Sequence, residues 1–209
     1  MEGVCVKHRG EENSIKMYDK QGSVLRVETT LNNPQRFRVY RCMRRKGRKV
    51  KGWYPLRKGI VDLRRRVELS RGANTRYLDA LAVVGVPRPA HRLLDPVSQP
   101  LKTPRPYRAL RPITPQETRL FAVVLRGESH LQGVRNRDLR DTLAPPGEPD
   151  PNQQRRAAAR ATCHLHLLRA HGLLYRVGRT YYYRPTQKGQ EIMNTALKFR
   201  QTDLALLAA

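Results

Sequence analysis

Apolar and polar residues alternate near the start of the chain. Two such runs, 14–20 (SIKMYDK) and 23–29 (SVLRVET), flank a turn that contains glycine, so the pattern predicts a β-hairpin. A three-residue loop that places Asp19 opposite Ser23 gathers the apolar side chains of both runs on one face. Gly22 then supplies the positive φ that such a loop needs.

The pattern changes after this hairpin. Short β-type runs at 4–9 and 36–41 predict two further strands around it. The next run, 44–53 (RRKGRKVKGW), has no apolar periodicity and is expected to form a mobile loop. Apolar residues at helical spacing over 55–85 predict two helices, broken near Gly72.

The second half of the chain segments into helices and a short ribbon. Helical spacing with capping residues predicts helices over 113–127, 136–143 (with Asn136 as its cap), 152–174 and 186–201. Between the last two helices, the runs LYRVGR and TYYYRP predict two short strands with Gly178 in the turn.

A proline-rich segment separates the two halves. Eight prolines lie within residues 86–115, and proline at that density favours an extended chain. We therefore expect a basic α/β domain over 1–85, a proline-rich linker over 86–112 and a second domain over 113–204. Because the chain begins almost inside a strand, either the helices after residue 55 cover the first sheet or the chain is the C-terminal part of a longer protein.

Charge narrows the class of partner. The chain of 209 residues contains 42 Lys and Arg but only 17 Asp and Glu, which gives a formal net charge of +25. Its apolar residues, 39% of the chain, are enough for a core. Such a charge concentrates a polyanion, so nucleic acid is the first candidate and an anionic membrane surface the second. No apolar run is long enough to span a membrane. Three widely spaced cysteines suggest no disulfide framework, which favours a reducing cytoplasm. With nucleic acid as the partner, we expect a nucleoid-associated protein.

The C-terminal pattern resembles a known family. Residues 165–192 (LHLLRAHGLLYRVGRTYYYRPTQKGQEI) are similar to winged-helix DNA-binding domains such as MarR-like and ArsR-like regulators. In that family a recognition helix ends at a glycine, runs into the wing, and a T-x-K-G sequence, here Thr186 to Gly189, starts the last helix. The resemblance implies a C-terminal winged helix-turn-helix. Together with the small antiparallel sheet, two helices and linker that the patterns predict before it, the chain is expected to be an α+β protein. It also implies double-stranded DNA as the partner and leaves both a monomer and a homodimer open.

The predicted helix over 152–174 has two chemically different sides. Placed at helical steps, Ala158, Ala161, Thr162 and Leu168 lie near Leu165 and form the expected buried stripe. The opposite side carries small or hydrogen-bonding residues without an acid, which suits the major groove. With the predicted wing and the basic run over 36–66, the expected DNA contacts are Asn152, Gln153, Arg156, Arg160, His164, Arg176, Arg179, Tyr182, Arg44, Arg45, Lys46, Arg48, Lys49 and Lys51.

A second, shorter resemblance concerns residues 15–29. Tyr18, Asp19, Lys20, Arg26 and Glu28 resemble the Tyr-Asp-Lys…Arg-x-Glu hairpin of rolling-circle replication initiators of plasmids and phages. This resemblance implies a relative or fragment of a replication or mobile-element enzyme that nicks DNA. A third alternative is an RNA-binding structural protein.

The sequence favours binding over chemistry. It lacks GxGxxG, P-loop, HExxH and GxSxG motifs, and the cluster Cys163, His164, His166 and His171 does not converge on one helix face. We expect no catalytic residue, no cofactor and no metal site.

Overall fold

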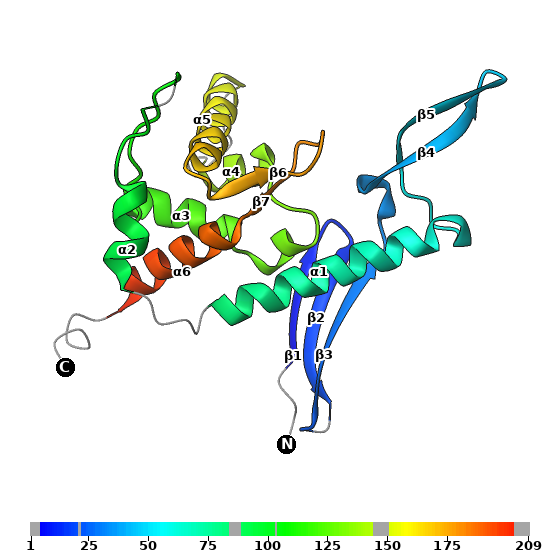
Figure 1. Cartoon of the computed structure of the whole chain (residues 1–209), viewed down its shortest axis with the longest axis horizontal. Helices are drawn as coiled ribbons and strands as arrows, with labels where there is room; N and C mark the ends of the chain where they lie inside the picture. The colour runs from blue at the N-terminus through cyan, green and yellow to red at the C-terminus, as the bar shows by residue number, and fades with distance from the viewer. Residues whose placement is uncertain (1–4, 21, 84–88, 103, 144–150, 203–209) are drawn as a thin grey trace. The chain divides into compact units, whose positions relative to one another are not determined.

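The fold is given by a computed structural model, which describes residues 5–20, 22–83, 89–102, 104–143 and 151–202. Within these ranges it is a mixed α+β protein with six α-helices and small antiparallel sheets (Figure 1), which confirms the predicted class. The chain divides into two compact units. The first extends to Leu78 and includes His130–Gln132; the second comprises Asp79–Ser129 and the chain from Gly133 onward.

The first unit contains an antiparallel meander of three strands. These are β1 (Cys5–Gly10), β2 (Asn13–Lys20) and β3 (Val24–Leu31), paired in that order. Ile15 on β2 is fully buried against Ala73 and Tyr77 of helix α1 (Leu63–Val83), together with Leu131. Alternation along β2 and β3 thus gives the sheet one apolar face for α1 to cover.

The β2–β3 hairpin keeps the predicted faces but changes the predicted register. Lys20 pairs with Val24 and Met17 with Val27, so Asp19 lies opposite Leu25 rather than Ser23. Ser23 instead belongs to the turn, where its backbone N–H and hydroxyl both bond the Lys20 carbonyl. A shift of two residues preserves which face each side chain occupies. Gly22 has the expected positive φ of 68°, whereas Gln21 lies outside the described residues.

The prediction of a mobile loop over 44–53 is wrong. This segment belongs to a second hairpin made of β4 (Arg38–Arg45) and β5 (Arg48–Pro55). Its two-residue turn has positive φ at Lys46 (48°) and Gly47 (77°), the backbone that matches the twist of paired strands. Apolar alternation is weak in this hairpin because most of its side chains are exposed and eight of its 18 residues are Lys or Arg.

Two 3₁₀ turns, Pro34–Arg36 (η1) and Ile60–Asp62 (η2), connect this hairpin to the rest of the first unit. Phe37, Val39 and Leu56 are buried together where the hairpin begins and ends. Leu31 of β3 and Leu69 of α1 pack against this small core, which joins the base of the hairpin to the rest of the first unit.

The prediction of two helices broken near Gly72 is also wrong, because α1 continues through that residue. Glycine inside a helix costs about 1 kcal/mol relative to alanine, a penalty that packing can offset. A Cβ at Gly72 would lie 3.1 Å from a guanidinium nitrogen of Arg76. That guanidinium donates to the backbone carbonyl of His130 at 2.8 and 3.0 Å, so the glycine leaves room for the Arg76 side chain.

The proline-rich segment belongs to the core of the second unit, where a linker was expected over 86–112. The described residues of this segment form helix α2 (Ala90–Leu94), a 3₁₀ turn (η3, Asp95–Val97) and an isolated β-bridge between Leu101 and Tyr107. Leu94, Val97 and Leu110 are buried, and Leu110 donates to the Val97 carbonyl. The apolar side chains between the prolines outweigh the extended tendency of proline. Residues 86–88 and Thr103 lie outside the described residues.

The rest of the second unit follows the predicted order. After helix α3 (Pro115–Val124) and a 3₁₀ turn (η4, Gly127–His130) come the remaining elements: α4 (Asn136–Leu143), α5 (Pro151–Ala170), β6 (Leu174–Arg176), β7 (Tyr183–Pro185) and α6 (Gln187–Gln201). Helix α5 packs against α4, and α6 against α3 (Figure 1). Their shared core includes the fully buried Phe121, Leu139, Leu168 and Ile192. The spacer over 144–150 and the end of the predicted domain at 203–204 lie outside the described residues.

Candidate nucleic-acid interface

Helix α5 buries one stripe and exposes the opposite side. Ala161, Leu165 and Leu168 are buried as predicted, and Ala157 joins them. Thr162, predicted to lie in the buried stripe, is exposed. The predicted contact residues Asn152, Gln153, Arg156 and Arg160 are all exposed, as is Arg155, which the sequence analysis did not select.

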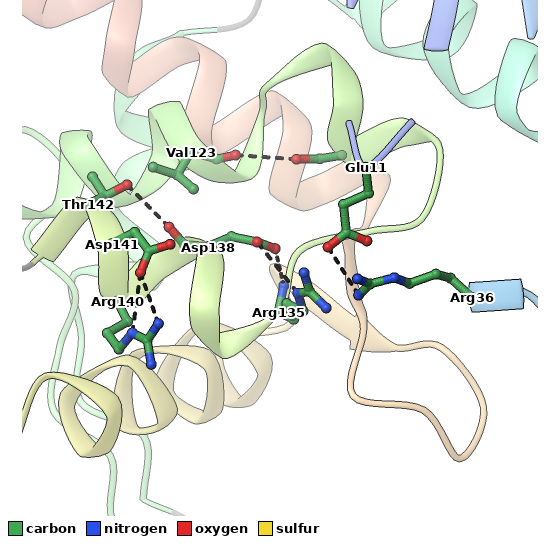
Figure 2. A network of polar contacts seen from close by, with 9 residues as sticks. Glu11, Arg36, Val123, Arg135, Asp138, Arg140, Asp141 and Thr142 are labelled. Carbon is green, nitrogen blue, oxygen red and sulfur yellow. Dashed lines mark hydrogen bonds and ion pairs between the residues drawn. The ribbon is translucent and has the colours of Figure 1, made fainter. Parts of the chain in front are cut away.

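Helix α4 holds α5 through one side chain. Asn136 donates its amide to the Ala158 carbonyl and to the Thr162 hydroxyl, at 2.7 Å each. The predicted role of Asn136 as the cap of its own helix is therefore wrong, because its side chain bonds α5 instead. Asp138 takes that role by accepting the backbone N–H of Arg135 at 2.9 Å, and Figure 2 shows these two residues facing each other.

The acids of α4 are paired with arginines. Arg135 lies 3.6 Å from Asp138, and Arg140 lies 3.2 Å from Asp141 (Figure 2). Neighbouring α5 and the β6–β7 ribbon contain no acid at all: residues 151–185 hold seven arginines and no Asp or Glu. This stretch therefore carries a single sign of charge, which attracts polyanions.

The β6–β7 ribbon has an ordered tip. Val177 donates its N–H to the Tyr182 carbonyl, and Gly178 has a φ of 52°. Arg179 follows in the turn and is exposed. Arg176, also exposed, donates to the Thr180 carbonyl and holds its guanidinium 5.8 Å from the ring centre of Tyr181.

The three tyrosines of the ribbon occupy different environments. Tyr183 is buried and exchanges two backbone hydrogen bonds of 2.7 Å with Val134, in the segment between α3 and α4. Tyr182 is half-buried with the Arg135 guanidinium over its ring, and Tyr181 is 82% exposed. The strand predicted over TYYYRP is shorter than expected, because β7 begins only at Tyr183.

His164 is less exposed than the other residues predicted on α5. It is half-buried, and burial followed by the Arg108 guanidinium lowers the pKa of its imidazole. A neutral imidazole beside Arg108 adds no positive charge at pH 7. His164 therefore adds little to the attraction of a polyanion, in contrast to the exposed Arg156 and Arg160.

The start of α6 is built around two close approaches. Thr186 accepts the Gly189 N–H at 2.9 Å and donates its hydroxyl to the Gly172 carbonyl at 2.7 Å. A Cβ at Gly189 would overlap the Leu173 carbonyl oxygen, so only glycine fits there. Gly172 itself has a φ of 74° and follows the end of α5. The spacing of Thr186 and Gly189 thus fixes how the ribbon and α6 meet.

The β4–β5 hairpin of the first unit forms a separate basic surface. The six residues predicted there are all exposed: Arg44, Arg45, Lys46, Arg48, Lys49 and Lys51. Residues 38–55 contain eight Lys and Arg and no acid. Tyr40 and Trp53 pair across this hairpin and are also exposed, although the sequence analysis did not select them.

Asp62 anchors the base of this hairpin. Its buried carboxylate accepts the backbone N–H of Arg57 at 2.8 Å and the guanidinium of Arg41 on β4. The Arg57 N–H, and after it the Arg41 guanidinium, hold the pKa of Asp62 below its ordinary value. Nearby in the first unit, Glu11 and Arg36 form another ion pair of 3.0 Å (Figure 2).

The residues behind the second resemblance contact one another on the β2–β3 hairpin. Tyr18 donates to Glu28 at 2.9 Å, and Glu28 pairs with Arg26 at 2.8 Å. The hydrogen bond to Glu28 raises the pKa of Tyr18. A raised pKa disfavours the phenolate, so this contact supports strand pairing and does not activate the hydroxyl.

Metal-binding clusters and membrane-spanning helices are absent from the described ranges. No three His, Cys, Asp or Glu side chains there lie close enough to hold a metal ion. Across the same residues, no helix combines the length and apolar content needed to cross a membrane.

Comparison of the chain with family models, with curated proteins and with solved structures gives no match. Its function is therefore inferred from its own residues.

Proposed function

We propose that this chain is a sequence-preferring binder of double-stranded DNA whose second unit is a winged helix-turn-helix. The observation that carries the proposal is the single sign of charge over residues 151–185, displayed by α5 and the ribbon that follows it. The order of elements supports it: α3, an isolated β-bridge at Val134, α4, α5, the β6–β7 ribbon and α6. Winged-helix domains share this order of helices and ribbon.

In this proposal α5 lies in the major groove. Arg156 and Arg160 are suited to fork onto guanine, and Asn152 and Gln153 onto adenine. The small side chain of Ala159 between them lets the helix backbone come close to the bases. The amino end of α5 also directs backbone N–H groups at a phosphate.

The ribbon and the β4–β5 hairpin supply contacts that carry no sequence information. Arg179 at the ribbon tip reaches backbone or minor groove, and Arg176 stands beside it. The exposed Lys and Arg side chains of the β4–β5 hairpin bind phosphates wherever the first unit reaches DNA.

The test is duplex affinity, measured by fluorescence anisotropy with a labelled duplex. The double variant Arg156→Ala/Arg160→Ala should weaken binding at least about tenfold, since each good base contact contributes about 1–3 kcal/mol. Arg119→Ala removes an exposed arginine from α3 in the same unit and serves as the matched control. Equal loss in both variants would show that α5 has no special place in binding.

The alternative function is that of a replication-initiator or mobile-element enzyme that nicks DNA. It predicts metal-dependent conversion of supercoiled plasmid to the open circle, abolished by a chelator. Binding to duplex without nicking supports the binding protein, and nicking supports the alternative. Competition with structured RNA separates both from an RNA-binding protein.

A further inference from the structure

The two faces of the β4–β5 hairpin differ in what they contact. One face is occupied at its base: Val39 is buried, Tyr54 is half-buried, and the Arg41 guanidinium lies 5.9 Å from the Tyr54 ring centre. The other face, which we call the aromatic basic face, is exposed along its length. It consists of Arg38, Tyr40, Cys42, Arg44, Lys49, Lys51 and Trp53.

Two aromatic rings lie in the middle of this face. Tyr40 and Trp53 are cross-strand partners, and their ring centres are 5.6 Å apart in an edge-to-face arrangement. They are 53% and 52% exposed, so neither belongs to the core that Phe37, Val39 and Leu56 form. Half of a large apolar surface on each ring is thus left to water, which favours a ligand that covers it.

The surrounding charge selects the kind of ligand. Basic side chains flank the ring pair on both strands, with Arg38 and Arg44 on β4 and Lys49 and Lys51 on β5. With no acid within residues 38–55, the face attracts a polyanion. A polyanion that also offers flat apolar surfaces is a nucleic acid with unpaired bases, because a duplex hides the faces of its bases in the stack.

We propose that the aromatic basic face binds single-stranded DNA, with an unpaired base stacked against the Tyr40–Trp53 pair and the flanking Lys and Arg side chains on phosphates. This site is made by the first unit alone and shares no residue with α5 or the β6–β7 ribbon. The choice of DNA over RNA rests on the function proposed above. The stacking of an unpaired base does not, because it follows from the hairpin itself.

Trp53 makes the proposal directly measurable, since it is the single tryptophan of the chain. Titration of the full chain with oligo(dT) should quench its fluorescence saturably. Inorganic polyphosphate, a polyanion without bases, should compete for the site and cause no comparable quenching. Equal quenching by polyphosphate or by a blunt duplex, or binding of oligo(dT) without quenching, would overturn the proposal. Affinity for oligo(rU) more than about tenfold above that for oligo(dT) would overturn the assignment to DNA.

Substitutions separate stacking from charge. Tyr40→Ala should weaken oligo(dT) binding about 5- to 150-fold, the range expected for loss of one base–aromatic stack, whereas Tyr40→Phe should keep it. Lys51→Gln should weaken oligo(dT) and polyphosphate binding by similar factors. Equal affinity of Tyr40→Ala and wild type for oligo(dT) contradicts stacking on this pair.

The same measurements keep this inference apart from the proposed function. Arg156→Ala/Arg160→Ala should leave quenching by oligo(dT) unchanged while it weakens duplex binding. Tyr40→Ala should weaken oligo(dT) binding and leave duplex binding unchanged. If the wild-type chain does not bind duplex DNA but oligo(dT) still quenches Trp53, the proposed function is contradicted and the single-strand site stands. If the chain binds duplex DNA but oligo(dT) does not quench Trp53, only the single-strand site is contradicted.

Discussion

The side-chain amide of Asn136 lies 2.7 Å from the backbone carbonyl of Ala158, so α4 is bonded to the middle of α5. The Thr162 hydroxyl accepts the same amide and donates to the same carbonyl at 3.0 Å. This triangle of hydrogen bonds fixes how α5 is rotated against α4. The rotation decides that Arg156 and Arg160 point outward.

Asn136→Ala should destabilise the second unit by about 1–3 kcal/mol, because it leaves Ala158 and Thr162 without their shared donor. Asn136→Asp should cost at least as much, since a carboxylate has the same shape but cannot donate to a carbonyl. Chemical denaturation measures both values. Arg137→Ala, an exposed neighbour on α4, is the control and should change stability by less than about 0.5 kcal/mol. An Asn136→Asp variant as stable as wild type would rule out the amide as a donor.

Gly189→Ala should destabilise the second unit by about 1–3 kcal/mol, because its methyl group would overlap the Leu173 carbonyl oxygen. Gly172→Ala should reduce stability by only about 1 kcal/mol, the cost of its positive φ, because the added Cβ meets open space. Thermal unfolding of the two variants compares a steric cost with a backbone cost. If Gly172→Ala were the more damaging of the two, the close approach at Gly189 would not be real.

Asp62 should make stability depend on acid pH. Its folded pKa lies below the value of about 3.9 for an unfolded chain, so its contribution is present above that value and is lost as pH falls through the folded pKa. Asp62→Asn should cost about 1.5–3 kcal/mol near pH 7, because it removes a charged partner of Arg41 and Arg57. Denaturation from pH 7 to pH 2 should show the difference between wild type and variant shrinking at the acid end. A difference that stays constant over this range would contradict the lowered pKa.

Local signals in the sequence were enough for α5 and the ribbon. Gly172 after the helix, Gly178 in the turn and Thr186 before α6 each act through their own backbone, so short windows reveal them. The outward side of α5 also followed from helical spacing. What spacing could not reveal is that Asn136 bonds α5 instead of capping α4, because that contact joins residues 22 positions apart.

A strand was predicted over 36–41, where β4 begins, but the turn and β5 were missed because charge hid the alternation. The clearest signal of the hairpin in the sequence was the Lys46-Gly47 pair between Tyr40 and Trp53. In the structure this pair is the two-residue turn, with positive φ at both positions, and Tyr40 and Trp53 are cross-strand partners. The burial of Leu94, Val97 and Leu110 was missed for a related reason, since the prolines around them dominated the pattern. For these three residues packing decided the structure where composition suggested an irregular chain.

Duplex binding should depend steeply on salt. If six to ten phosphates are neutralised, affinity should fall about 10³- to 10⁵-fold between ~50 and ~200 mM salt. Arg179→Ala should reduce the slope of log affinity against log salt by about one, because it removes one phosphate contact. Anisotropy titrations over that salt range provide the slope. A flat response would contradict binding through the phosphate backbone.

Selection of bound duplexes from a random pool tests most directly whether α5 reads a DNA sequence. The full chain and its Arg156→Ala/Arg160→Ala variant are carried through the same rounds, with Arg119→Ala as the matched control. Wild type and Arg119→Ala should enrich the same motif, and the double variant should recover duplexes without it. Equal enrichment of that motif by the double variant, or no motif with the wild-type chain, would contradict sequence reading by α5.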